Sequence, residues 1–169
     1  RHTAGQRLAV LVNDFGALPI DADLIESVDG DVIGIAGGCV CCSYGSDLIA
    51  ALEELGTRAP RPDRLLIETS GVGLPGAVAA AVTLLPGHRI DAILVLADAE
   101  TVEQRAGDRY MGDTVRRQLH DADLIVLNKT DLVDAPRRAA LRTWLDECAP
   151  GRPVIECVAG QLPAVVAFG

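Results

Sequence analysis

The chain has 169 residues, a net charge of −9 and 49% hydrophobic residues, with two Tyr, two Phe and one Trp. This length supports one core of Val, Leu, Ile and Ala and is short for two domains. The acidic balance argues against a nucleic acid or an anionic membrane as partner, because phosphate binding depends on Lys and Arg. No apolar run reaches the roughly eighteen residues that predict a membrane span.

Short aliphatic runs alternate with helical patterns along the chain, and such runs are typical of strands buried in a parallel sheet. The expected strands cover residues 7–13, 31–35, 64–68, 90–97, 124–127 and 154–157. The expected helices cover residues 46–55, 75–85, part of 100–120, 135–148 and 161–168, and Gly56 is expected to end the first of them. This alternation predicts an α/β fold with a doubly wound, mostly parallel sheet and helices on both faces.

A polar turn, Asn13-Asp14-Phe15-Gly16, follows the first expected strand. Open α/β sheets place their ligands at this carboxyl end of the strands. The Asp14 carboxylate is suited to bind a metal ion such as Mg²⁺, and it is equally suited to cap the turn. The residues alone leave both interpretations open.

Three thiols, Cys39, Cys41 and Cys42, occupy four positions behind two glycines. A disulfide framework is disfavoured because the cysteines are odd in number. A redox pair of Cys41 and Cys42 is disfavoured because adjacent cysteines form a strained ring. Clustered thiolates suit zinc, which takes sulfur ligands at about 2.3 Å. In an extended segment Cys39 and Cys41 would point one way and Cys42 the other. We therefore expect a metal site in a reducing, cytoplasmic compartment.

The strand at residues 64–68 ends in Glu68, and a glycine follows three positions later at Gly71. This order suits a Walker-B and switch element, with Glu68 near a Mg²⁺ ion and the Gly71 amide free to approach a γ-phosphate. A charged residue at a strand end is also commonplace. Asp98, at the end of the next strand, is more simply expected to cap the segment that follows it.

The residues Asn128-Lys129-Thr130-Asp131 follow a buried strand and match the guanine-recognition pattern of GTP-binding proteins. The Asp131 carboxylate can accept hydrogen bonds from the ring N–H and the exocyclic amine of guanine, and adenine lacks both donors at those positions. The Lys129 stem can lie along the base, and Asn128 can brace the loop. The alternative is a solvated turn before a helix.

With these motifs in this order, the chain resembles the CobW-type GTPases, the cobalamin-synthesis and zinc metallochaperone family of P-loop proteins. The resemblance spans nearly all of the chain. It implies a GTP-hydrolysing protein that uses GTP and Mg²⁺, binds Zn²⁺ or Co²⁺ and delivers the metal to a client metalloprotein, and it leaves a homodimer open. By this resemblance, the metal positions are Cys39, Cys41 and Cys42, with Asp14 where the family usually has Glu, the Walker-B pair is Glu68 and Gly71, and the base site is Asn128, Lys129 and Asp131.

The phosphate-binding pattern G-x-x-x-x-G-K-[ST] does not occur in the 169 residues. The simplest interpretation is that residues 1–169 form an incomplete GTPase domain that lacks its amino-terminal phosphate loop and a carboxyl-terminal domain. On that interpretation hydrolysis belongs to the intact protein, and this chain alone is expected to be inactive. The competing hypothesis is a metal-binding scaffold that does not hydrolyse GTP.

Overall fold

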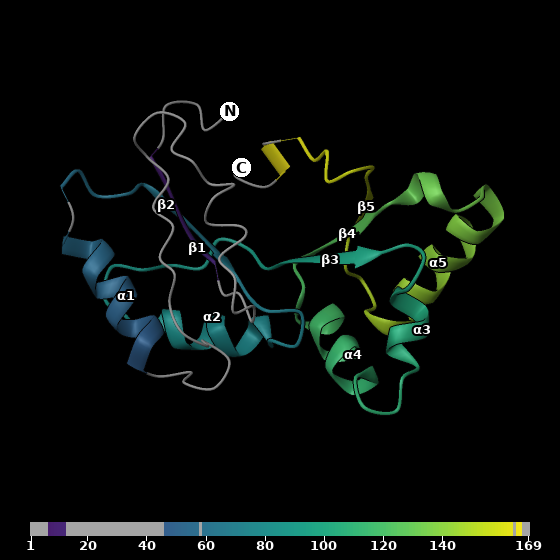
Figure 1. Ribbon diagram of the computed structural model, residues 1–169, viewed down its shortest axis with the longest axis horizontal. Helices are drawn as coiled ribbons and strands as arrows, with labels where there is room; N and C mark the ends of the chain where they lie inside the picture. Colours follow the sequence, from purple (N-terminus) through teal and green to yellow (C-terminus); the bar gives the residue numbers. More distant parts are fainter. Residues whose placement is uncertain (1–6, 13–45, 58, 164, 167–169) are drawn as a thin grey trace, which may run out of the picture. The chain divides into compact units, whose positions relative to one another are not determined.

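The computed structural model describes residues 7–12, 46–57, 59–163 and 165–166. The chain divides into two compact units, Arg1–Gly73 and Leu74–Gly169 (Figure 1). The first unit contains β1 (Leu8–Val12), α1 (Ser46–Thr57) and β2 (Arg64–Glu68). The second unit contains α2 (Pro75–Thr83), β3 (Leu94–Asp98), α3 (Val102–Ala106), α4 (Gly112–Asp121), β4 (Leu124–Asn128), the 3₁₀ turn η1 (Thr130–Leu132), α5 (Ala135–Cys148) and β5 (Val154–Glu156).

In the first unit, β1 and β2 pair in parallel, from Leu8 opposite Arg64 to Val12 opposite Glu68. The helix α1 buries Leu48, Leu52 and Leu55, which recur at the spacing of one helical face. The carboxyl ends of both strands therefore lie at one edge, where residue 68 is the last of β2.

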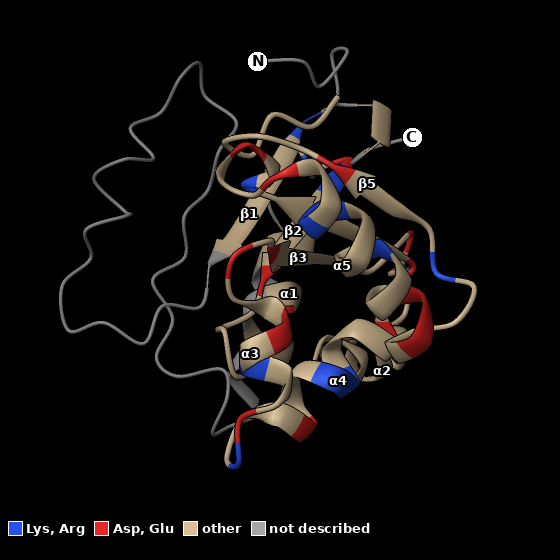
Figure 2. Cartoon of the chain, turned by 90° about the vertical axis from the view of Figure 1, so that its right-hand side faces the viewer, with Lys and Arg blue, Asp and Glu red and all other residues tan. Residues whose placement is uncertain are grey.

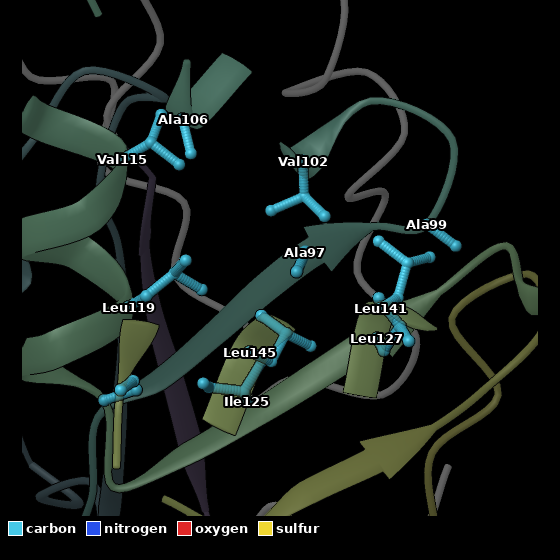
Figure 3. Packing of buried hydrophobic residues seen from close by; sticks show 12 residues of the cluster. Ala97, Ala99, Val102, Ala106, Val115, Leu119, Ile125, Leu127, Leu141 and Leu145 are labelled. Carbon is cyan, nitrogen blue, oxygen red and sulfur yellow. The ribbon is translucent and has the colours of Figure 1, made fainter. Parts of the chain in front are cut away.

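In the second unit, three parallel strands form a sheet in the order β3-β4-β5. The central strand β4 is the most deeply buried, and Ile125 and Leu127, two residues apart, point to one face. Leu141 and Leu145 of α5 and Leu119 of α4 pack near them in one cluster (Figure 3). Aliphatic side chains supply this core, as the composition requires, and the parallel α/β fold predicted from the sequence is confirmed.

The bounds of several elements differ from those expected. β3 begins at Leu94 rather than at residue 90, because its neighbour β4 begins at Leu124, the partner of Leu94, and the ladder starts there. α1 continues through Gly56 to Thr57, since one glycine near a helix end costs only about 1 kcal/mol relative to alanine. Residues 161–163 are not helical, and helix is described only at residues 165–166.

The strand expected at residues 31–35 lies outside the described residues. Over the part of the chain that the structure describes, no helix is long and apolar enough to cross a membrane.

Candidate functional site

Two loops lie side by side where β4 and β5 end. The first loop carries residues 128–131, and the second, residues 157–160, follows β5. Since β4 and β5 are neighbouring parallel strands, their carboxyl ends meet at one edge of the sheet. This edge is where open α/β sheets bind ligands. We call these two loops together the paired loops.

Thr130 links the paired loops. Its backbone N–H and its hydroxyl both donate to the carbonyl oxygen of Cys157, at 3.3 and 3.1 Å. Cys157 in turn donates its backbone N–H to Leu127 at 2.9 Å, which continues the ladder between the strands. The Thr130 side chain is 4% exposed, so its hydroxyl requires this internal partner.

Asn128 makes a second link between the paired loops. Its Oδ1 accepts a hydrogen bond from the backbone N–H of Gly160 at 3.0 Å and another from the Cys157 thiol at 3.3 Å. The bracing role expected of Asn128 therefore reaches across to the neighbouring loop. Both links together fix the position of one loop against the other.

The backbone of the paired loops is held in unusual conformations. Among the described residues, Lys129 (φ 60°) and Ala159 (φ 49°) are the non-glycine residues with positive φ, and Gly160 follows at φ 68°. A side chain at positive φ is costly unless the surroundings enforce it, and such residues cluster at functional sites. One of these residues lies in each loop, so the paired loops are a candidate binding site on backbone geometry alone.

The end of the Lys129 side chain is held by an ion pair. Its Nζ lies 2.7 Å from Oδ2 of Asp98, the last residue of β3. The hydrogen bond from Lys129 lowers the pKa of Asp98, and the same bond raises the pKa of Lys129. Both groups are therefore charged at neutral pH, and the end of the lysine side chain is anchored.

Asp131 offers an open carboxylate beside these groups. The residue is exposed and lies in the middle of η1, the 3₁₀ turn that begins directly after the left-handed Lys129. Within the described part of the chain its carboxylate has no hydrogen-bond partner. Asp131 can thus accept two hydrogen bonds from a ligand that presents two adjacent N–H donors, as guanine does.

The loop of residues 157–160 was not predicted as part of the site. The sequence carried a weak signal for it, an Ala-Gly pair shortly after the last strand. Asp98 was expected to cap the segment after β3, and its Oδ1 does accept the backbone N–H of Glu100 at 2.9 Å. Its second oxygen binds Lys129, which the sequence did not indicate.

Glu68 and Gly71 lie at the end of β2, in the first unit. Glu68 is exposed, and a turn follows in which Gly73 donates its N–H to the carbonyl of Ser70 at 2.8 Å. A Cβ atom added at Gly71 would meet nothing within 4 Å. Glu68 and Gly71 are both exposed to solvent, and their roles in Mg²⁺ and phosphate binding stay predictions.

The expected metal positions Asp14, Cys39, Cys41 and Cys42 lie outside the described residues. In the stretches that the structure describes, no three His, Cys, Asp or Glu side chains are grouped to hold a metal ion. The other two cysteines, Cys148 and Cys157, are free thiols.

Comparisons with known proteins show which proteins this chain is similar to. Residues 1–156 match the family model described as CobW/HypB/UreG, nucleotide-binding domain. A zinc chaperone CobW of a Sinorhizobium species is 32% identical, over 98% of this chain and 55% of the relative. A zinc-regulated GTPase metalloprotein activator of Schizosaccharomyces pombe is 29% identical, over 94% of this chain and 40% of the relative.

Among solved structures, the Zn(II)-bound YjiA GTPase from E. coli aligns with a TM-score of 0.64 and 21% identity. The alignment covers 97% of this chain and 52% of that one. At this identity the likeness establishes the fold, which is that of a P-loop GTPase. The chain spans about half the length of the curated relatives that it matches.

Proposed function

The chain belongs to the CobW/HypB/UreG family of nucleotide-binding domains, and on that premise we propose that it is the guanine-nucleotide-binding part of a GTP-hydrolysing metallochaperone. In this proposal the protein binds zinc or a similar divalent ion through Cys39, Cys41 and Cys42, and it delivers the ion to a client metalloprotein. The names of the curated relatives, zinc chaperones and a GTPase metalloprotein activator, support this class of function.

The observation that carries the nucleotide half of the proposal is the geometry of the paired loops. Lys129 has a left-handed backbone conformation, and Asp131, two residues later, is exposed to solvent. The backbone at Ala159 and Gly160 is held in place by Asn128. A guanine base would be read by Asp131 at its two N–H donors and would pack against the Lys129 stem.

Glu68 and Gly71 fit the hydrolytic part of the proposal. Mg²⁺, when bound, would neutralise negative charge on the transferring phosphoryl group. Glu68 presents an exposed carboxylate of the kind that Mg²⁺ binds, directly or through water. Gly71 is proposed to lie beside the γ-phosphate, because a residue without a Cβ atom lets a ligand come close to the backbone, and a Cβ added there would meet nothing within 4 Å.

The metal half of the proposal rests on the chemistry of the thiols. Cys39 and Cys41 are two residues apart in the sequence, so in an extended segment they would point to one side, and we propose them as the surest pair of ligands. Asp14, two residues after the end of β1 in the sequence, is proposed to add a carboxylate ligand to this site. Zinc bound by these groups is the cargo, and the nucleotide state is proposed to control its release.

Zinc titration of the intact protein, with and without GTP and Mg²⁺, tests this function. We expect stoichiometric binding with proton release, because thiols must ionise to bind zinc, and an affinity that changes when GTP is present. The double substitution Cys39→Ser and Cys41→Ser should abolish the stoichiometric zinc binding and the proton release that accompanies it.

Cys148→Ser is the matched control for this titration. Burial raises the pKa of the Cys148 thiol, so this cysteine does not favour the thiolate, and its replacement should leave zinc binding unchanged. Stoichiometric binding retained by the double variant would place the metal site elsewhere. A zinc affinity that is the same with and without GTP would contradict the coupling.

A further inference from the structure

Asp98 lies next to the paired loops, although it belongs to neither. We propose that Asp98 is a positioning residue of the base site, which holds the free end of Lys129 so that the lysine stem forms a fixed wall for the purine ring. This inference rests on the proposed function, because it assigns a further residue to the same nucleotide site.

The strand register brings Asp98 to this position. Asp98 ends β3 directly opposite Asn128, the last residue of β4. The next residue, Ala99, donates its N–H to the Asn128 carbonyl at 3.0 Å, so the two chains stay paired one step further. The residue after Asn128 is Lys129, and its side chain therefore starts beside the Asp98 carboxylate.

The Asp98 carboxylate is itself oriented by the backbone. Its Oδ1 accepts the N–H of Glu100 at 2.9 Å, which fixes a tight turn after β3. This bond leaves Oδ2 to accept from the Lys129 Nζ at 2.7 Å. Each carboxylate oxygen thus has its own hydrogen-bond donor, and Oδ2 is oriented toward the Lys129 ammonium.

Stability alone does not account for this ion pair. The Lys129 and Asp98 side chains are 49% and 26% exposed, and exposed pairs contribute little to folding. Lys129 nevertheless adopts a left-handed backbone conformation, which is unfavourable for a side chain of this size. Lys129 thus combines an unfavourable backbone conformation with a side chain whose end is held by an ion pair. This combination favours ligand binding, since an anchored side chain loses less conformational entropy when a ligand packs against it.

This role differs from that of Asp131 in a way that can be measured. A methylene stem packs against any purine ring and does not distinguish one base from another. The carboxylate of Asp131 reads the donors of the base. Loss of the Asp98 carboxylate should therefore lower the affinity for all purine nucleotides by the same factor. A change at Asp131 should instead alter the relative affinities for different purine nucleotides.

The test is GDP and XDP binding to the intact protein and its Asp98→Asn variant, by calorimetry. Asparagine keeps an oxygen for the Glu100 N–H but removes the charge that holds Lys129. We expect Asp98→Asn to bind GDP roughly threefold to tenfold more weakly, as for the loss of one charge-assisted hydrogen bond at a partly exposed site. The ratio of GDP to XDP affinity should not change.

Two further variants make the test specific. Lys129→Met keeps an unbranched stem without the ammonium, so adding Asp98→Asn to Lys129→Met should produce no further loss of affinity. Asp91→Asn removes an exposed carboxylate that pairs with Arg89 away from the site, and GDP affinity should stay at the wild-type value.

Several results would overturn the inference. These are an Asp98→Asn variant with wild-type affinity, a loss that persists in full in the Lys129→Met background, or a changed ratio of GDP to XDP affinity. Failure of the wild-type protein to bind GDP at all would instead contradict the base site itself. The two kinds of failure are thus distinguishable.

Discussion

Lys129 and Ala159 hold left-handed backbone conformations in neighbouring loops without the freedom of glycine. Such conformations cost about 1–3 kcal/mol each, so the contacts around them must maintain them. The contacts are few and specific: Thr130 to Cys157, and Asn128 to Gly160. The Thr130 hydroxyl is the contact that a single substitution removes most cleanly.

Replacement of Thr130 by Val should loosen the paired loops. Valine has nearly the same shape but no hydroxyl, and the loss of one buried hydrogen bond costs about 0.5–1.5 kcal/mol. We expect a decrease of this size in the free energy of unfolding and a parallel loss of GDP affinity. Urea unfolding and calorimetry measure the two effects.

Thr130→Ser is the matched control, because serine keeps the hydroxyl and loses a buried methyl group. Its free energy of unfolding should fall by about 0.8 kcal/mol, while its GDP affinity stays close to that of the wild type. Equal GDP affinities for the Val and Ser variants would show that the hydroxyl does not organise the site.

Residue types alone were enough to predict Asn128, Lys129 and Asp131 as the base site, because a polar string at the end of a buried strand is visible in the sequence. The contribution of Asp98 was not visible. It depends on the register that sets residue 98 opposite residue 128, and one sequence does not specify strand register. The loop of residues 157–160 was missed for the same reason, since its role comes from hydrogen bonds to a distant segment.

At the scale of elements, β4 and α5 determine where the paired loops lie. Ile125 and Leu127 of β4 and Leu141 and Leu145 of α5 are each 0% exposed and belong to one cluster. Asp134 begins α5 by accepting the N–H of Arg137 at 2.8 Å, directly after η1. The loop that carries Asp131 is therefore fixed at both ends by buried or capped elements.

Leu145→Ala should destabilise the second unit by about 2–5 kcal/mol, the range for a fully buried leucine that leaves a cavity. The fluorescence of Trp144, the chain's one tryptophan, reports this unfolding because Trp144 packs against the same core. Leu84→Ala is the control: Leu84 is 83% exposed, and its truncation should change the free energy by about 0.5 kcal/mol or less. Equal effects of the two substitutions would contradict the assigned core.

The elements were largely predictable from aliphatic runs and helix signals. The bounds of β2 and α5 agree with the expected ones, because a buried strand and a helix with Asp134 and Pro136 at its start carry strong local signals. The start of β3 was misplaced because the largely aliphatic run begins at Ile90, ahead of Leu94, where pairing with the neighbouring strand starts. Pairing, rather than hydrophobicity, sets that boundary.

At the scale of the whole molecule, acidic residues outnumber basic ones, 24 to 15. Figure 2 shows basic residues interspersed with acidic ones along the helices over the described residues, rather than gathered in one basic stripe. The net charge of −9 is the basis for the prediction that the chain has no nucleic-acid partner, because phosphate binding depends on Lys and Arg.

The central claim, that the paired loops recognise guanine through Asp131, is tested most directly by Asp131→Asn in the intact protein. The new amide can donate to the extra carbonyl of xanthine, and it no longer accepts both donors of guanine. Measured by competition, affinity for GTP should fall by at least about tenfold, equivalent to about 1.4 kcal/mol, while XTP binding is kept or improved. An unchanged GTP affinity with no gain in XTP preference would contradict the assignment of the base site.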